Sequence, residues 1–202
     1  MGAECTGKTT LAQSLATALN RPTDPWLFAP EALRAWCNEH QRTPLAVEQI
    51  SIARAQADSV MAIQRLGASV IADTAPLMTA IYSDVLFQDT SLYAFALEHH
   101  RSYDLTLFTA PDLPWEADGL QRDGKQARAK ISEKLREILA LNGLAHTVVC
   151  GDGQARTQSA LDAIAHHCRK PAARSAHDTV WKWACDTCAD AECEHRLFSK
   201  LL

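Results

Sequence analysis

The segment Gly2-Ala3-Glu4-Cys5-Thr6-Gly7-Lys8-Thr9 is a complete G-x-x-x-x-G-K-[ST] phosphate-binding loop, and it decides the fold. Its backbone N–H groups can curl around an anion at the start of the next helix, whose dipole favours negative charge. Lys8 is expected to reach the β- and γ-phosphates of a nucleotide, and the Thr9 hydroxyl to hold the Mg²⁺ that bridges them. Thr10 can cap the same turn, so residues 2–10 form the predicted nucleotide-binding segment.

The residues after the loop support this interpretation. Leu11, Leu15, Ala18 and Leu19 recur at helical spacing within the segment from Thr9 to Leu19. The loop therefore opens an amphipathic helix, as a phosphate-binding loop does. A glycine-rich turn without a ligand is the weaker alternative.

The position of the loop, one residue after Met1, is unusual. A phosphate-binding loop normally follows the C-terminal end of a buried strand, and no strand precedes it in this sequence. That strand is usually central, so its loss would expose strand edges and remove buried apolar area worth roughly several kcal/mol. We therefore expect the gene to be translated from a site upstream of Met1, with apolar codons in frame just before it.

Composition narrows the class of protein. The chain has 202 residues and a formal net charge of -4, without a dominant basic face, which argues against nucleic acid or a membrane surface as partner and favours small molecules. No apolar run approaches the ~18 residues of a membrane span, and a cytoplasmic protein is expected. The odd count of 7 cysteines favours reduced thiols or metal ligands over disulfides.

Apolar segments alternate with helical patterns along the chain. Strands are expected at residues 25–28, 68–73, 103–108 and 146–150, with helices at 31–37, 50–66, 92–97, 131–139 and 161–168 between and after them. This alternation predicts parallel βαβ units, hence a three-layer α/β P-loop fold that binds ligand at the carboxyl ends of its strands. We expect a P-loop domain at 1–170 and a Cys-rich tail at 171–202.

Two carboxylates are candidates for catalysis. Asp73 ends an apolar strand, where P-loop proteins keep the acidic residue that binds Mg²⁺; the alternative is a cap for the next helix. Glu31 follows the preceding predicted strand and could orient or deprotonate an acceptor hydroxyl. The alternative for Glu31 is a solvated residue in the first turn of a helix.

The segment at 114–124 has the composition of a hinged lid, with glycines on both sides of Arg122. An arginine that closes over the γ-phosphate would stabilise transition-state charge and exclude water. A solvated surface arginine is the alternative.

The loop, together with Pro30-Glu31-Ala32-Leu33-Arg34, Ile71-Ala72-Asp73-Thr74 and the lid pattern of residues 115–122, resembles the NadR-type P-loop ATPase/kinase family over about residues 2–168. The resemblance to its kinase domain implies transfer of the γ-phosphate of ATP to nicotinamide riboside, with Lys8, Asp73, Glu31 and Arg122 as catalytic residues. Where that kinase has a second acidic residue two positions after the strand-end aspartate, this chain has Ala75.

Two other functions stay open. A regulatory ATPase or nucleoside triphosphatase would hydrolyse nucleotide without an acceptor, and Ala75 favours it. A non-catalytic interaction module would keep the nucleotide site only as a vestige.

The tail carries Cys185, Cys188, Cys193 and His195, ligand types that suit a structural, tetrahedral Zn²⁺. Reduced cysteines without a metal are the alternative, because Cys193 and His195 are only two positions apart and zinc knuckles space their last two ligands more widely. The pairs His99-His100 and His166-His167 lie in helical patterns, so we expect partly exposed histidines there instead of metal ligands.

Overall fold

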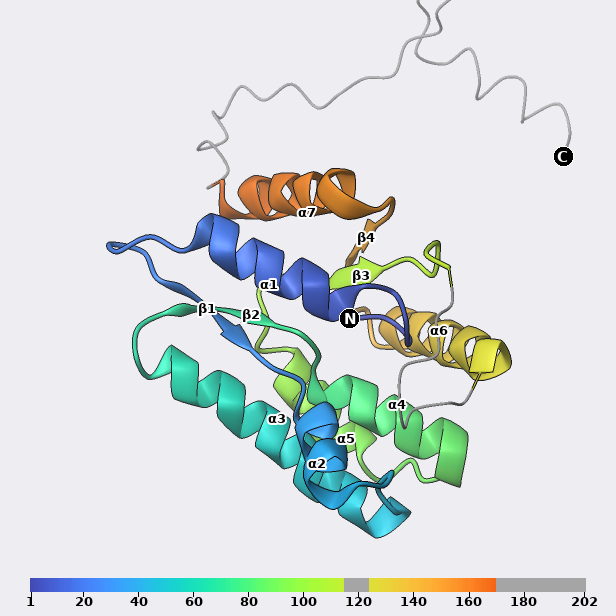
Figure 1. Ribbon diagram of the computed structural model, residues 1–202. Helices are drawn as coiled ribbons and strands as arrows, with labels where there is room; N and C mark the ends of the chain where they lie inside the picture. The colour runs from blue at the N-terminus through green and yellow to red at the C-terminus, as the bar shows by residue number, and fades with distance from the viewer. Residues whose placement is uncertain (115–123, 170–202) are drawn as a thin grey trace, which may run out of the picture. The chain divides into compact units, whose positions relative to one another are not determined.

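The computed structural model describes residues 1–114 and 124–169, and Met1–Cys168 forms one compact unit (Figure 1). Its helices are α1 (Lys8–Leu19), α2 (Ala32–His40), the short 3-10 helix η1 (Ala46–Glu48), α3 (Gln49–Gln64), α4 (Pro76–Phe87), α5 (Tyr93–His100), α6 (Gly124–Leu141) and α7 (Gly153–Cys168). Its strands are β1 (Trp26–Ala29), β2 (Ser69–Ala72), β3 (Leu107–Thr109) and β4 (Thr147–Val149).

The strands pair in parallel, as the alternation of strands and helices predicts. β1 pairs with β2 from Trp26 opposite Ser69 onward, and β3 pairs with β4 from Leu107 opposite Thr147 onward. The described residues thus contain two 2-stranded parallel sheets. The predicted α/β P-loop class is confirmed, although the sheet is divided into two halves.

Helices cover both faces of the strands. α1 packs on β1, β2 and α7, whereas α3 packs on the opposite side of β1 and β2 (Figure 1). The α1 side is an apolar cluster built on Leu11, Leu15 and Ile164. The other side holds the larger core, in which Leu77 and Ile81 of α4 contact the buried face of α6. This layering brings the carboxyl ends of β1 and β2 beside the start of α1.

Helix α4 has no counterpart among the helices expected from periodicity. Its buried residues cover most of its circumference and include the run from Pro76 to Ile81. A helix that is buried on nearly all sides has no polar stripe, so the 3.6-residue pattern is weak. Pro76 is well placed in its first turn, where a missing N–H breaks no helical bond.

Strand β3 is shorter than the apolar run that predicts it. The expected strand covers residues 103–108, whereas the paired residues are Leu107–Thr109. Tyr103 and Asp104 instead precede the strand and line a cavity.

Within the described residues, no helix is both long and apolar enough to cross a membrane.

Candidate functional site

The phosphate-binding loop is held in shape by its glycines and by the end of β3. Gly7 adopts a φ of 70° at the start of α1, a left-handed conformation that suits glycine. A Cβ at Gly2 would collide with the Thr109 hydroxyl. The buried Thr6 hydroxyl bonds to the Ala3 carbonyl and to the Thr109 hydroxyl, at 2.8 Å each. The loop is therefore anchored to β3, with its N–H groups at the amino end of α1.

Lys8 lies within the loop and is surrounded by carboxylates. Its Nζ donates a 2.7 Å hydrogen bond to the Ala3 carbonyl. Burial lowers the pKa of Lys8, while the nearby charges of Glu31, Asp73 and Glu4 act in the opposite direction. A cation placed in this loop can neutralise phosphate oxygens.

Thr9 and Asp73 meet at the end of β2. The Thr9 hydroxyl donates a 2.6 Å hydrogen bond to Asp73 Oδ2, and the Asp73 side chain is almost fully buried, with 3% of its residue surface exposed. Its other oxygen, Oδ1, has no partner among the described residues, and neither has the neighbouring Thr74 hydroxyl. Hydroxyl and carboxylate oxygens are the ligands that Mg²⁺ prefers, so this donor set fits the ion.

Asp73 does not cap the following helix. The N-cap of α4 is Ala75, and no side-chain cap is formed there. Thr10 does not cap α1 either: the N-cap is Gly7, without a side-chain bond, and Thr10 is exposed. The helix-cap alternative for Asp73 is therefore wrong, and metal binding by Asp73 stays a prediction.

Glu31 joins this cluster from the connection between β1 and α2. Its side chain is 12% exposed and lies 3.5 Å from Arg34 Nε. Glu31 stands at the N-cap position of α2, but its side chain makes no cap hydrogen bond there. Because this side chain is mostly buried, Glu31 is not a solvated residue in the first turn of the helix. Burial raises the pKa of Glu31, and the charges of Lys8 and Arg34 oppose this shift. A desolvated carboxylate takes up a proton more readily than a solvated one.

Two buried side chains that sequence reasoning missed support the site. Gln56 of α3 accepts a hydrogen bond from the Ala32 N–H at 2.8 Å and donates one to the Pro30 carbonyl at 3.2 Å. It therefore clamps the backbone on both sides of Glu31. Nothing in the spacing of Gln56 distinguishes it from a surface glutamine.

Arg156 of α7 is the second missed residue. Its buried guanidinium donates to the carbonyls of Thr6, Gly151 and Ala110 and pairs with the Asp112 carboxylate. One side chain thus ties the phosphate-binding loop to the segments that follow β3 and β4. A single arginine in a helical pattern gives no signal of such a role.

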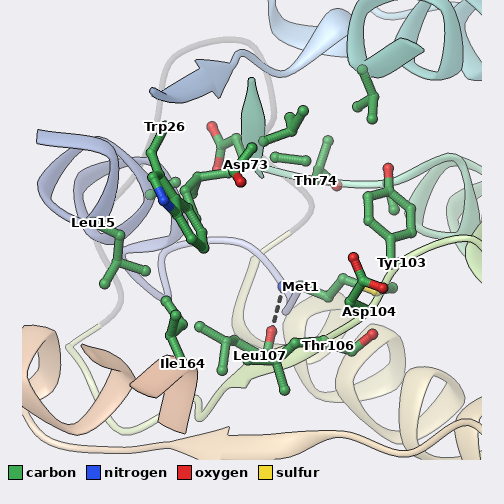
Figure 2. A pocket seen from close by; sticks show the side chains of 18 of the residues that line it. Met1, Leu15, Trp26, Asp73, Thr74, Tyr103, Asp104, Thr106, Leu107 and Ile164 are labelled. Atoms are coloured by element: carbon green, nitrogen blue, oxygen red, sulfur yellow. Dashed lines mark hydrogen bonds between the residues drawn. The ribbon is translucent and has the colours of Figure 1, made fainter. Parts of the chain in front are cut away.

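A largely apolar cavity of about 550 Å³ begins beside Lys8, Asp73 and Thr74 and continues between β2 and the segment before β3. Figure 2 shows Leu15, Trp26, Leu107 and Ile164 among its lining residues, together with Met1.

The predicted lid, with Arg122, and the predicted zinc ligands Cys185, Cys188, Cys193 and His195 lie outside the described residues. Across residues 1–114 and 124–169, no group of three or more His, Cys, Asp or Glu side chains could hold a metal ion. His100 was expected to be partly exposed, but it is buried and its Nε2 lies 3.0 Å from the Thr106 hydroxyl.

Comparison with known proteins bears on this site. A family model described as an AAA domain matches residues 1–156. The chain belongs to this AAA domain family. No curated protein sequence matches the chain.

Solved structures of NadR and of a deoxyadenosine kinase share the fold. A crystal structure of NadR protein in complex with NR has a TM-score of 0.67 and 22% identity over 83% of this chain and 48% of the NadR chain. NadR in complex with NAD and AMP-PNP gives a TM-score of 0.66 and 21% identity over 88% and 50%. The chain thus spans about half the length of NadR. The resemblance to the NadR-type P-loop family is confirmed in the fold.

A deoxyadenosine kinase from M. mycoides, with products dcmp and a flexible dcdp bound, is also similar. Its TM-score is 0.57 at 13% identity, over 82% of this chain and 97% of the kinase. The AAA domain described here therefore has the fold of P-loop nucleoside kinases, with its loop, Asp73 and Glu31 at one edge.

Proposed function

We propose that the protein is an ATP-dependent kinase that transfers the γ-phosphate to a small acceptor, nicotinamide riboside or a related nucleoside. The observation that carries the proposal is the convergence of Glu31 with Lys8, Thr9 and Asp73 at the carboxyl ends of β1 and β2. A buried carboxylate close to the lysine can orient and deprotonate an acceptor hydroxyl, which supports transfer to an acceptor.

The geometry supports a role for each of these residues. The loop N–H groups and Lys8 hold the phosphates, and Thr9 and Asp73 would hold Mg²⁺, which neutralises charge on the phosphate oxygens. The oxygen of the acceptor hydroxyl forms a bond to the γ-phosphorus while the bond from that phosphorus to the ADP oxygen breaks. Glu31 accepts the proton that the acceptor hydroxyl loses. Its raised pKa makes it a stronger base than a solvated carboxylate.

The nature of the acceptor rests on the similar structures. NadR has been crystallised with NR and with NAD and AMP-PNP, and the deoxyadenosine kinase with nucleotide products. Nucleosides are therefore the first acceptors to test, with nicotinamide riboside at the head of the series.

A second function is a nucleoside triphosphatase or regulatory ATPase of the NadR type. Ala75 favours it, because the second acidic residue of the kinase pattern is replaced by a buried methyl group at this position. Such an enzyme would hydrolyse ATP at the same rate with or without a nucleoside.

The decisive experiment measures ADP release from ATP and Mg²⁺ in the presence of single nucleosides. We expect nicotinamide riboside or a related nucleoside to stimulate release by roughly tenfold or more, because an acceptor hydroxyl replaces water in the reaction. Asp73→Asn should lower the stimulated rate by about a hundredfold, since it removes a charge that positions the metal. Asp58→Asn, an exposed position on α3, is the matched control and should change little.

The other outcomes separate the alternatives. ADP release that no nucleoside stimulates would contradict the kinase and support the ATPase. Nucleotide binding without any ADP release would support the non-catalytic module.

A further inference from the structure

Helix α6 carries an arginine on the face that it buries. The buried residues of α6 recur at helical spacing, and the first of them is Arg128, which is 7% exposed. The apolar members of this face, Ile131, Leu135 and Leu139, belong to the core that α6 forms with α4 (Figure 1). A guanidinium in such a place loses its hydration, which is costly unless an anion compensates the charge.

The bonds of Arg128 compensate its charge only in part. Both terminal nitrogens donate to one acceptor, the Leu113 carbonyl, at 3.0 Å each. The buried Nε has no partner, and neither has the buried Ser132 hydroxyl one turn further along α6. Across residues 1–114 and 124–169, no carboxylate forms an ion pair with Arg128. Because a guanidinium keeps its charge in proteins and has five N–H donors, one neutral carbonyl does not balance it.

Arg156 shows how this interior balances an arginine that only supports the fold. It is as deeply buried as Arg128, but it pairs with the Asp112 carboxylate and bonds to three carbonyls. Arg128 has no such set of partners among the described residues. Its charge is therefore suited to an anion that binds to the protein.

The partner of Arg128 places it beside the phosphate-binding loop. A Cβ at Gly7 would lie 3.1 Å from Leu113 Cδ1, so Leu113 packs directly on the loop. The loop itself has one lysine, and the charges of Glu31, Asp73 and Glu4 all act on it. Three carboxylates around one lysine oppose the arrival of a polyphosphate, so a further cation at this place favours its binding.

We propose that Arg128 is a second phosphate-binding cation of the nucleotide site, which exchanges the Leu113 carbonyl for phosphate oxygens when ATP binds. This deepens the proposed function, because it rests on ATP binding at the loop. A phosphate offers the guanidinium a charged acceptor that its forked donors match. The long side chain can make this exchange by rotation about its own bonds. Arg128 thus stabilises the protein with ATP bound and destabilises it without ATP.

The test replaces Arg128 by a side chain of similar length without charge. In Arg128→Met, affinity for a non-hydrolysable ATP analogue should fall roughly tenfold or more, because charged hydrogen bonds to phosphate are lost. Tm without nucleotide should be unchanged or higher, because the variant removes a buried charge. Lys130→Met, at an exposed position of the same helix, removes an equal charge and should change neither quantity. Isothermal titration and scanning calorimetry supply the two readouts.

Two further measurements separate a phosphate contact from other roles. Affinity for adenosine, which has no phosphate, should be the same in Arg128→Met as in the unchanged protein, by competition with a labelled nucleotide. Arg128→Lys keeps a point charge that can bind phosphate without the fork, so it should regain part of the affinity for the ATP analogue.

Unchanged affinity for the ATP analogue in Arg128→Met, or an equal loss of affinity for adenosine, would overturn the proposal. If Arg128→Met lowers both Tm and affinity, Arg128→Lys decides. Regained affinity supports the phosphate contact, whereas no gain shows that Arg128 shapes the loop through Leu113 and overturns it.

The Arg128 proposal and the kinase proposal can fail separately, because these readouts measure binding and not turnover. ADP release that no nucleoside stimulates would contradict the kinase and leave the phosphate contact of Arg128 intact. A protein that does not bind the ATP analogue would overturn both.

Discussion

Arg156 shows how a single buried residue can control the shape of the phosphate-binding loop. Its guanidinium bonds to the Thr6 carbonyl, 150 positions away in sequence, and to the Asp112 carboxylate. Arg156→Lys keeps the charge but cannot donate in several directions from one plane. We expect the variant to bind ATP roughly tenfold more weakly, because the carbonyls that it leaves unpaired move the loop. Isothermal titration with a non-hydrolysable ATP analogue measures this.

Arg65→Lys is the matched control, because Arg65 is exposed at the end of α3. It should bind the analogue as tightly as the unchanged protein. If Arg156→Lys lowers Tm but leaves affinity for the analogue unchanged, Arg156 stabilises the fold without positioning the loop.

The residues of the site differ in how far sequence could identify them. Lys8 and Thr9 belong to a contiguous motif, and Asp73 ends an apolar run, so local patterns predict a place for each at the phosphate-binding loop. Arg156 and Gln56 act through partners that the fold alone brings close. No local pattern encodes such distant hydrogen bonds, and this is why both were missed.

At the scale of elements, α3 holds the connection that carries Glu31. Gln56 bonds to the backbone at Pro30 and Ala32 and is 1% exposed. Gln56→Leu has a similar volume but leaves both backbone groups unpaired, so the connection shifts. We expect kcat with the nucleoside acceptor to fall by roughly tenfold while affinity for ATP is unchanged, since the loop itself is not touched.

Steady-state kinetics with ATP and the stimulating nucleoside checks this prediction. Gln13→Leu on the exposed face of α1 is the control for the exchange of an amide for an apolar side chain. A loss of ATP affinity equal to the loss of kcat would show that Gln56 supports the nucleotide site as a whole and not Glu31.

A helix could be predicted from the sequence where only one of its faces is buried. α1 alternates buried leucines with exposed residues, so its helical period is readable from Leu11 and Leu15. α4 is buried on most of its surface and gives no such period. β3 begins later than its apolar run indicates, because Tyr103 and Leu105 line the cavity and do not extend the pairing with β4.

At the scale of the whole molecule, the parallel order of strands follows from the alternation with helices, but the cavity between β2 and the segment before β3 does not. Only the structure shows this cavity, with Met1 in its lining and the Met1 amino group bonded to the Leu107 carbonyl. The packing of α1 against α7 and of α4 against α6 likewise depends on contacts that no local pattern encodes.

The same interior makes stability depend on pH. Burial lowers the pKa of His100 from 6.5 to about 4, and that of the Met1 amino group from 8.0 to about 5. Both groups bind protons more weakly in the folded state than in the unfolded chain. Their contribution to stability is therefore complete above the unfolded pKa and is lost as pH falls toward the folded value. The raised pKa of Glu31 acts in the opposite direction at lower pH.

We therefore expect Tm to fall steadily between pH 8 and pH 5, first through the Met1 amine and then, below about pH 6.5, through His100. For His100 the loss of unfolding free energy between pH 7 and pH 5 is on the order of 2 kcal/mol. His100→Gln keeps a polar partner for the Thr106 hydroxyl but does not titrate, so it should flatten the lower half of the curve. In this variant the fall of Tm in the upper half of the pH range should persist, because the Met1 amine remains. A variant in which an added residue converts the Met1 amine to an amide should lose the fall in the upper half instead. Tm that is flat across the range, or an unchanged slope in His100→Gln, would show that water reaches these groups in the folded protein.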